Sequence, residues 1–482
     1  MIHPQRHVLS VISASMLLCA CAVTPTTPPV LMSAPTHYKE TGTWRQTSGE
    51  AAQVPDAWGL LYNDSVLNDL EHRVVIGNEN LKASIAQLAT ARAVMEASRS
   101  ATLPTASIGL SATRSANSVA SSTNIQNPGN SVGLSASASW ELDVWGRLAQ
   151  ASSGAQAGYQ ASANDLAAAT LSTQALLAQT YFSLRTQEAQ QSLLERSVQA
   201  YQRALDLTHV RRLGGVAALG EELQAQTQLT NAQSQLAEAI AQRALLEHAI
   251  AVLLGVSPST FSIERTAAVP STVLVPMTLP SELLQRRPDI AAAQQRVAAA
   301  NAQAGVADAA FFPALSLSST VGYNQTSFAN LVSTPNLVWS FGTTLAQSIL
   351  DGGQRKLASA QARSAVEQAT ASYRQLVLSS LQEVEDNLIL SAQLQKEVEL
   401  QTQSLQSAQR SLEITMDQYR AGTVSYLNVA TAQNVALNAE SALLTIRNRQ
   451  LASVNQLLKN IAGRWQAVDA IKSNANDGSA TN

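Results

Sequence analysis

The sequence places few side chains where they could perform covalent chemistry together. Its two cysteines, Cys19 and Cys21, lie near the N-terminus, and no HExxH motif, nucleophile elbow or P-loop is present. The later histidines have no carboxylate or cysteine partner at the spacing of a catalytic or metal site, and the later methionines lie far apart. We therefore expect no enzyme, no cofactor and no metal, and no preference for copper or silver as cargo. These residues are His37, His72, His209, His248, Met32, Met95, Met277 and Met416.

The chemistry of the cysteines points instead to export. Residues 1–20 are typical of a signal peptide, with Arg6 before an apolar run that is too short to cross a bilayer as a helix. The string LCAC at residues 18–21 resembles the lipobox of bacterial lipoproteins, in which the cysteine after the cut is diacylated. We favour Cys21, because Leu18 and Ala20 then occupy the third and first positions before the cut. An ordinary signal-peptidase site is the alternative.

Two features follow from Cys21 as the lipid anchor. Cys19 leaves with the signal peptide and Cys21 is modified, so the mature chain has no free thiol and no disulfide, which suits an oxidising periplasm. Ala22 is not acidic, and by the same resemblance this directs a lipoprotein to the outer membrane. Residues 24–35 are rich in Pro and Thr and predict a spacer between the anchor and the folded body.

Composition narrows the class of protein further. The net charge is −3 and 13% of residues are charged, so there is no basic footprint for nucleic acid. No stretch of twenty apolar residues follows the signal peptide, which excludes a transmembrane helix but not membrane-spanning strands. Only 4% of residues are aromatic, and long tracts of Ala, Gln, Ser and Leu indicate helices packed through small side chains.

The elements are organised as an internal repeat. Residues 350–463 repeat residues 142–255 with a displacement of about 208. Each copy begins with Leu-Asp and a Gly-bearing turn, and then predicts a proline-free helix over 147–210 or 354–419, roughly 95 Å long. A second Gly turn leads to a shorter helix of about 58 Å, over 216–254 or 424–462. Helices of roughly 36 Å are predicted over 80–102 and 287–311, so each half provides one long helix and two shorter helices stacked end to end.

The seams between these helices are of the coiled-coil kind. Leu437, Leu444, Leu451 and Leu458 recur every seven residues, and Val454 and Ile461 follow at heptad spacing. Other heptads hold Ala and Gln, and such narrow stripes are typical of the wall of a hollow tube. A cytosolic coiled-coil scaffold explains the heptads equally well, but it does not explain the signal peptide or the strands.

Four segments alternate small or polar residues with apolar ones and are long enough to cross a membrane as strands. Trp140, Tyr323 and Trp339 suit an interfacial aromatic girdle, although ordinary packing explains them as well. A membrane barrel has no open edge and at least eight strands, so four strands per chain require two, three or four copies. A lumen disfavours the eight-stranded dimer. The predicted strands are 105–114, 131–141, 314–323 and 337–349, joined by polar loops at 117–130 and 324–336.

Several strings together resemble one family, the TolC-like outer-membrane efflux channels, and most closely its NodT/OprM-type lipoprotein branch. They are SWELDVWGR at 139–147, AVLLG at 251–255, LPSELLQRRPDI at 279–290 and YRAG at 419–422, and the resemblance covers about residues 58–465. It implies a homotrimer with a twelve-stranded outer-membrane β-barrel, a long periplasmic α-helical barrel and a mixed equatorial region. The expected organisation is a signal peptide (1–20), an anchor and spacer (21–57), a first repeat (58–255), an equatorial linker (256–285), a second repeat (286–463) and an equatorial tail (464–482).

By this resemblance, the protein is a passive exit duct for drugs or other small toxic compounds. It is lipid-anchored in the outer membrane, extends into the periplasm, and works with a periplasmic adaptor and an inner-membrane transporter of the resistance-nodulation-division type. The outer-membrane channel of a type I protein secretion system is the alternative, against which the lipobox and the RRPDI string argue. The sequence does not identify the cargo.

The resemblance also implies an iris-like gate at the tips of the two helical hairpins, which touch the adaptor. Relatives often carry a leucine ring followed by an acidic ring; here Leu427 is at the first position and Thr431 at the second, with Asn428 where some members have a second aspartate. Glu221 and Glu222 are alternative acids for the pore, or simply helix-start acids that complement the helix dipole. The adaptor-contact residues are Arg212, Leu213, Gly214, Gly215, Ala421, Gly422, Thr423 and Val424.

Overall fold

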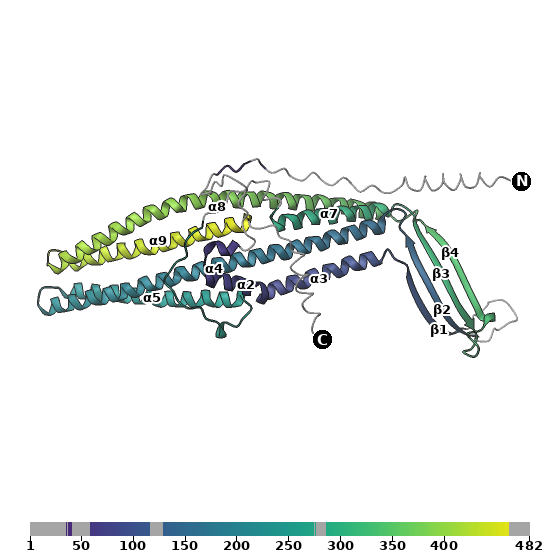
Figure 1. The fold of residues 1–482 in the computed structure, drawn as a ribbon, viewed down its shortest axis with the longest axis horizontal. Coiled ribbons are helices and arrows are strands. Elements are labelled where there is room, and N and C mark those ends of the chain that lie inside the picture. The colour runs from purple at the N-terminus through teal and green to yellow at the C-terminus, as the bar shows by residue number, and fades with distance from the viewer. Residues whose placement is uncertain are drawn as a thin grey trace. The chain divides into compact units, whose positions relative to one another are not determined.

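The computed structural model describes residues 35, 37–40, 58–115, 129–273, 275 and 286–461, so the signal peptide and Cys21 lie outside the described residues. Helices dominate, with one four-stranded sheet (Figure 1). No helix in these residues has the length and apolar content to span a membrane. The elements are η2 (Trp58–Tyr62), α2 (Ser65–Gly77), α3 (Glu79–Ser100), β1 (Thr105–Ser115), β2 (Gly129–Leu142), α4 (Arg147–Leu213), α5 (Leu219–Leu253), η3 (Pro258–Thr260), α7 (Pro288–Ala309), β3 (Ala314–Gln325), η4 (Thr334–Asn336), β4 (Leu337–Ala346), α8 (Gln354–Arg420) and α9 (Tyr426–Ile461).

The two long helices are equal in length. α4 and α8 each hold 67 residues, slightly more than the sequence predicts. The shorter helices α5 and α9 begin at Leu219 and Tyr426, later than predicted. The residues before them complete the glycine turns that end α4 and α8, because their backbone N–H groups bond back to the preceding helix.

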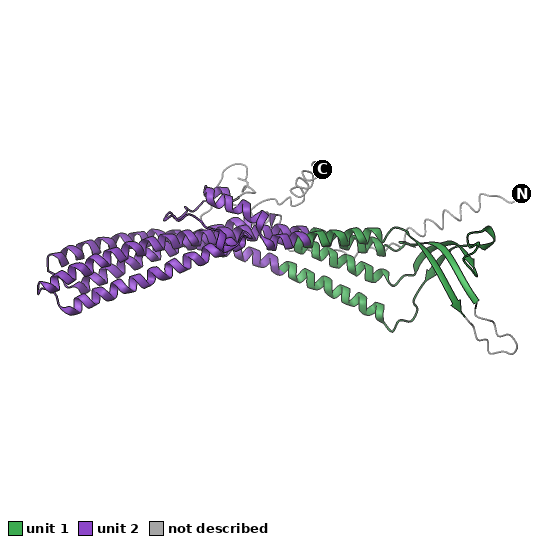
Figure 2. Ribbon diagram, turned by 90° about the horizontal axis from the view of Figure 1, so that it is seen from below, with its two compact units in different colours: residues 1–31, 87–162, 292–374 green, residues 32–86, 163–291, 375–482 purple. Residues whose placement is uncertain are grey.

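The chain divides into two compact units, coloured separately in Figure 2. The described part of unit 1 comprises segments of 87–162 and 292–374, and that of unit 2 comprises segments of 32–86, 163–291 and 375–461. Each unit therefore takes segments from both halves of the chain, so the units do not follow the boundary between the predicted repeats. The division into two repeats remains a prediction from the sequence pattern.

Unit 1 contains the sheet, whose strands are antiparallel neighbours in the order β1-β2-β3-β4. β2 pairs with β3 through Trp140 opposite Leu317, which joins the two halves of the chain. β4 ends at Ala346 rather than at 349 as expected, because its partner Ala314 is the first residue of β3 and the ladder stops there. In the described residues β1 and β4 each have a strand on one side only.

In the same unit, hydrogen bonds made by residues 139–147 fix the start of α4. Asp143 accepts hydrogen bonds from the backbone N–H groups of Leu148 (3.0 Å) and Ala149 (2.7 Å), which would otherwise be unpaired. Arg147 donates to both carboxylate oxygens of Glu141. The indole N–H of Trp145 donates to the carbonyl of Pro313 at 2.6 Å. These bonds hold the end of β2 against the start of α4.

Unit 2 has the larger apolar core. α2 packs through Leu67 and Val74 against the middle of α4, where Tyr181 and Phe182 are buried. The predicted heptad seam on α9 is confirmed, since five of its members are buried and Leu444 packs against a neighbouring cluster. The buried members are Leu437, Leu451, Val454, Leu458 and Ile461.

A buried ionic network in unit 2 holds the segment after α5 against the first hairpin. Glu188 on α4 is fully buried and accepts from Arg185 at 2.7 Å and from Arg243 of α5 at 3.1 Å. The two arginines also donate to the carbonyls of Glu264 and Ile263 at 2.8 Å. Every charge is therefore matched by an opposite charge or a backbone dipole, as a buried ion pair requires.

Candidate functional site at the hairpin tips

The two hairpin tips use the same helix-ending motif. Gly215 has φ of +74° and Gly422 has φ of +79°, a region that glycine adopts without the steric cost of a Cβ. In the first tip, the N–H of Gly215 donates to the carbonyl of Arg212 and the next N–H donates to that of Arg211. The N–H of Gly422 and the one after it make the equivalent bonds to Tyr419 and the preceding residue. Both turns are Schellman motifs, so sequence repetition here corresponds to structural repetition.

A cluster of four residues joins the two hairpins just inside these turns. Nη1 of Arg211 on α4 donates to the carbonyl of Tyr419 on α8 at 2.6 Å, and the guanidinium lies 4.6 Å from the Tyr419 ring centroid. The hydroxyls of Thr208 and Tyr419 are 3.0 Å apart, and the Tyr419 and Tyr426 rings meet edge to face at 5.8 Å. Both tyrosines and Thr208 are almost fully buried. We call Thr208, Arg211, Tyr419 and Tyr426 the tip cluster.

Tyr426 in this cluster is uncharged at physiological pH. Burial raises the pKa of Tyr426 to about 12, and the neighbouring tyrosines add to the effect. The contact between the hairpins is made by one cation, two packed aromatic rings and hydrogen bonds.

The acids proposed from the sequence differ in their surroundings. Glu222 bonds to Nδ1 of His209 at 2.7 Å and also pairs with Arg212, all within the first hairpin. The hydrogen bonds from His209 and Arg212 lower the pKa of Glu222. The expectation that His209 has no carboxylate partner is thus wrong, because α4 and α5 fold back on each other and bring positions 209 and 222 together. Both Glu221 and Glu222 lie in the first turn of α5, where acids complement the helix dipole.

The residues predicted at the constriction lie on one exposed stripe of α9. Leu427 is 56% exposed, and Asn428 and Thr431 are also exposed, whereas Val429 and Ala430 between them are buried. The Thr431 hydroxyl donates to the carbonyl of Leu427 at 2.8 Å. The stripe therefore faces away from the core of its own chain and carries no charge. Among the tip residues, Leu213, Gly214, Gly215, Ala421, Gly422 and Thr423 are exposed and Arg212 and Val424 are partly exposed.

Comparison with known proteins gives the family. The sequence profile of the family described as outer membrane efflux protein matches residues 72–256 and again residues 279–463, one match in each half. The chain belongs to the outer membrane efflux protein family. The resemblance inferred from the sequence is therefore confirmed, and the protein is an outer-membrane component of an efflux system that extends into the periplasm.

Family members of similar length cover nearly the whole chain. It is 28% identical over 470 residues to the pyoverdine export outer membrane protein OpmQ of Pseudomonas aeruginosa, covering 95% of this chain and 97% of that one. It is 27% identical to the toluene efflux pump outer membrane protein TtgC of Pseudomonas putida, with 87% of each chain covered. The solved outer-membrane channel OprN superposes with a TM-score of 0.85 at 25% identity, over 92% of this chain and 100% of that one. The expected TolC-like fold is confirmed.

The structure adds a contact that sequence reasoning did not predict. Tyr419 lies in the YRAG string and Arg211 lies at the first predicted tip, but no interaction between them was expected. The repeat gave no signal for this contact, because the Schellman turns match Gly215 with Gly422 and so make Tyr419 equivalent to Arg212.

Proposed function

We propose that three copies of the chain form the exit duct of a tripartite efflux system, which carries drugs or other small toxic compounds from the periplasm to the exterior. The observation that carries the proposal is the double match to the efflux family. The names of relatives, which include an antibiotic efflux pump protein and a toluene efflux pump protein, favour small-molecule cargo. A periplasmic adaptor and an inner-membrane transporter of the resistance-nodulation-division type complete the system. In this proposal Cys21 carries the lipid.

The trimer is proposed from the edges of the sheet. β1 and β4 each leave one row of backbone N–H and C=O groups without a strand partner in the described residues. Such groups must be paired inside a bilayer, where no water can satisfy them. Three copies supply twelve strands and close the ring, with a lumen wider than that of an eight-stranded barrel.

The gate is proposed at the tip cluster. Opening the periplasmic end requires the two hairpins of a chain to move apart, and the contacts from Arg211 to Tyr419 oppose that movement. A partly buried hydrogen bond from a charged donor contributes roughly 1.5–3 kcal/mol, and a cation–π contact contributes roughly 0.5–2 kcal/mol. Their loss therefore shifts the equilibrium between closed and open tips by about tenfold or more.

The constriction is proposed to be neutral. Leu427, Asn428 and Thr431 form the exposed stripe on α9, and three copies of it place leucine, amide and hydroxyl groups around the pore. Glu222 is a weaker candidate for pore charge because Arg212 already forms an ion pair with it and His209 is hydrogen-bonded to it. Glu221 remains the better acidic candidate. The exposed tip residues, from Arg212 to Gly215 and from Ala421 to Val424, are proposed to touch the adaptor.

A gene deletion separates efflux from type I secretion. Loss of the gene should increase susceptibility to several small toxic compounds and leave the secreted proteome unchanged, and the wild-type gene should restore resistance. Unchanged susceptibility together with a missing secreted protein would establish the secretion channel instead. A Cys21→Ser variant, compared by mass spectrometry with wild type, should lose the mass of the attached acyl chains.

A further inference from the structure

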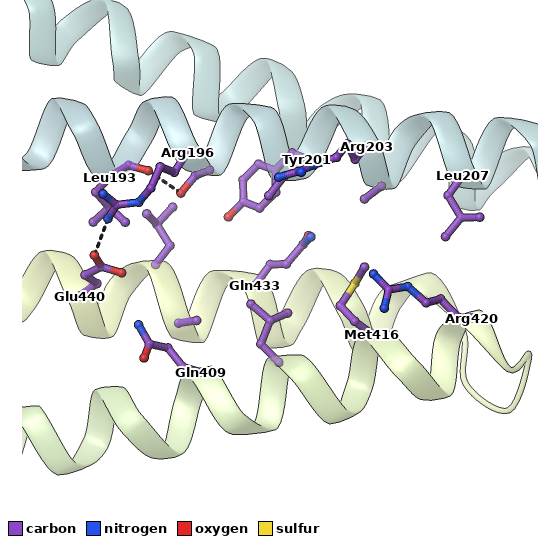
Figure 3. A pocket seen from close by; sticks show the side chains of 16 residues that line it. Leu193, Arg196, Tyr201, Arg203, Leu207, Gln409, Met416, Arg420, Gln433 and Glu440 are labelled. Carbon is purple, nitrogen blue, oxygen red and sulfur yellow. Dashed lines mark hydrogen bonds and ion pairs between the residues drawn. The ribbon is translucent and has the colours of Figure 1, made fainter.

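A cavity of about 530 Å³ lies between the two hairpins of one chain, within unit 2. Figure 3 shows α4 on one side and α8 with α9 on the other. This volume is within the range of pockets that hold small organic molecules. Much of the wall is apolar, formed by residues such as Leu207, Leu412, Met416 and Leu437. The cavity therefore has the size and the surface for an apolar body of drug-like dimensions.

Gln433 is the polar group at the centre of this wall. It is only 4% exposed, and its Oε1 atom is buried without a hydrogen-bond partner. Figure 3 shows its side chain extending from α9 toward Tyr201 of α4, into the cavity. A buried amide oxygen that gives up water without gaining a donor is unfavourable. A molecule in the cavity that carries a hydrogen-bond donor would satisfy it.

The charges around the cavity are mainly positive. Arg196, Arg203 and Arg420 line it, and Glu440 is the one carboxylate among the lining residues. Glu440 is already paired with Arg196 at 2.7 Å, and Arg420 pairs with an exposed aspartate on its own helix. Arg203 donates to the carbonyl of Gln199 and has no ion pair with a carboxylate of the described residues. Its guanidinium can therefore accept an anionic partner without breaking an existing ion pair.

We propose that this cavity is a binding site for small organic anions that combine an apolar, preferably aromatic, body with one carboxylate or sulfonate and one hydroxyl group. The apolar walls receive the body, Arg203 binds the anionic group, and Oε1 of Gln433 accepts a hydrogen bond from the hydroxyl. Such a molecule contacts α4 of the first hairpin and α8 and α9 of the second at the same time. It thus favours the arrangement in which the two hairpins lie together, by the ordinary linkage between binding and conformation.

Binding and its effect on the gate are separable. The binding site depends only on the described geometry of unit 2, whereas inhibition of the channel rests on the proposed function, in which the hairpins separate. The matched probes are 6-hydroxynaphthalene-2-sulfonate, which is an anion, and 6-hydroxynaphthalene-2-sulfonamide, which has nearly the same shape and the same hydroxyl donor without the charge. Isothermal titration calorimetry of the full-length, detergent-solubilised protein measures both, and partition into micelles contributes a component that does not saturate.

The expected result is saturable binding of the sulfonate at one site per chain, with the sulfonamide bound at least about tenfold more weakly. Arg203→Gln and Gln433→Leu should each weaken the binding of the sulfonate by about tenfold. Arg203 is exposed, so its variant should fold even if a change at buried Gln433 disturbs packing. Arg449→Gln is the matched control. Arg449 is an exposed arginine like Arg203, with one weak ion pair, and it does not line the cavity. The Arg449→Gln variant should bind the sulfonate as tightly as wild type does.

The site is overturned if the sulfonate shows no saturable binding, or if the sulfonamide and both cavity variants bind as tightly as the reference. Channel recordings on the same preparations then separate the two proposals. If the channel conducts but does not bind the sulfonate, the proposed binding site is wrong and the proposed duct stands. Saturable binding that leaves conductance unchanged supports the site and contradicts the proposed movement of the hairpins.

Discussion

Arg211 of the first hairpin and Tyr419 of the second lie 208 residues apart in the chain and contact each other directly. The guanidinium of Arg211 donates to the Tyr419 carbonyl at 2.6 Å and lies 4.6 Å from the centroid of its ring. The two Schellman turns match Gly215 with Gly422, so the position equivalent to Tyr419 is Arg212 and not Arg211. The contact therefore joins non-equivalent positions of two similar hairpins.

Removal of Arg211 should loosen the tips. Arg211→Ala loses both the charged hydrogen bond and the cation–π contact, so the open state should gain about tenfold or more in population. Cells that carry this variant should take up a bulky hydrophilic antibiotic more readily, measured as a lower inhibitory concentration. Arg410→Ala is the control, because the ion pair that Arg410 forms in the described residues is with Glu413, on the exposed surface of the same helix. Equal antibiotic entry for both variants would argue against a gate at the tip cluster.

The charge of the constriction is tested at Thr431. If Thr431 faces the pore in three copies, Thr431→Asp introduces a ring of three carboxylates and should make the channel strongly cation-selective. Reversal potentials in a salt gradient measure the change. Thr431→Asn is the size-matched neutral control and should leave selectivity as in wild type. If the aspartate variant also keeps wild-type selectivity, Thr431 does not line the pore.

Glu71 should make the stability of unit 2 depend on pH. This carboxyl is 8% exposed on α2, and burial raises its pKa to about 7. The pKa of Glu71 is therefore higher in the folded state than in the unfolded state. Its contribution to the free energy of unfolding is complete below about pH 4 and is lost as the pH rises through 7. Wild type should therefore lose up to about 3 kcal/mol relative to Glu71→Gln between pH 4 and pH 8. Melting temperatures of both proteins across this range give the difference, and parallel curves would show that Glu71 does not titrate in a buried site.

Substitution of Glu188 should destabilise the fold more than substitution of most other acidic residues outside the tips. Glu188→Gln leaves Arg185 and Arg243 without the carboxylate that they share in a buried site, at a cost of about 3–5 kcal/mol. Glu195→Gln is the matched control, since its pair with Arg265 is more than a third exposed and contributes under about 1 kcal/mol. Thermal unfolding of both variants gives the comparison. Similar small losses would mean that solvent reaches Glu188 and screens the pair.

Much of the fold follows from local sequence rules. Arg147 to Leu213 contains no proline and many good helix formers, so one long helix could be expected, and the glycine turns located its end. The last residues of β4 were not predictable in this way. The alternating pattern continues to Ile349, but the ladder stops at Ala346 because Pro313 ends the partner strand, a fact that depends on pairing between distant segments.

The site was less accessible to sequence reasoning for the same reason. Family resemblance selected Leu427 and Thr431, and the structure places both on one exposed face of α9, four residues apart. The pairing of Glu222 with His209 and Arg212 depends on how α4 and α5 fold back, which a list of spacings along the chain does not reveal. Arg211 and Tyr419 needed the same tertiary information.

Single-channel recording tests the central claim, that this chain forms a duct closed by contacts between its hairpins. Purified protein and the Arg211→Ala variant are compared in planar bilayers under identical salt and voltage. We predict that both conduct, and that the variant opens more often or to larger conductance levels because its tips are less tightly held. Absence of conductance from both well-folded preparations would contradict the account.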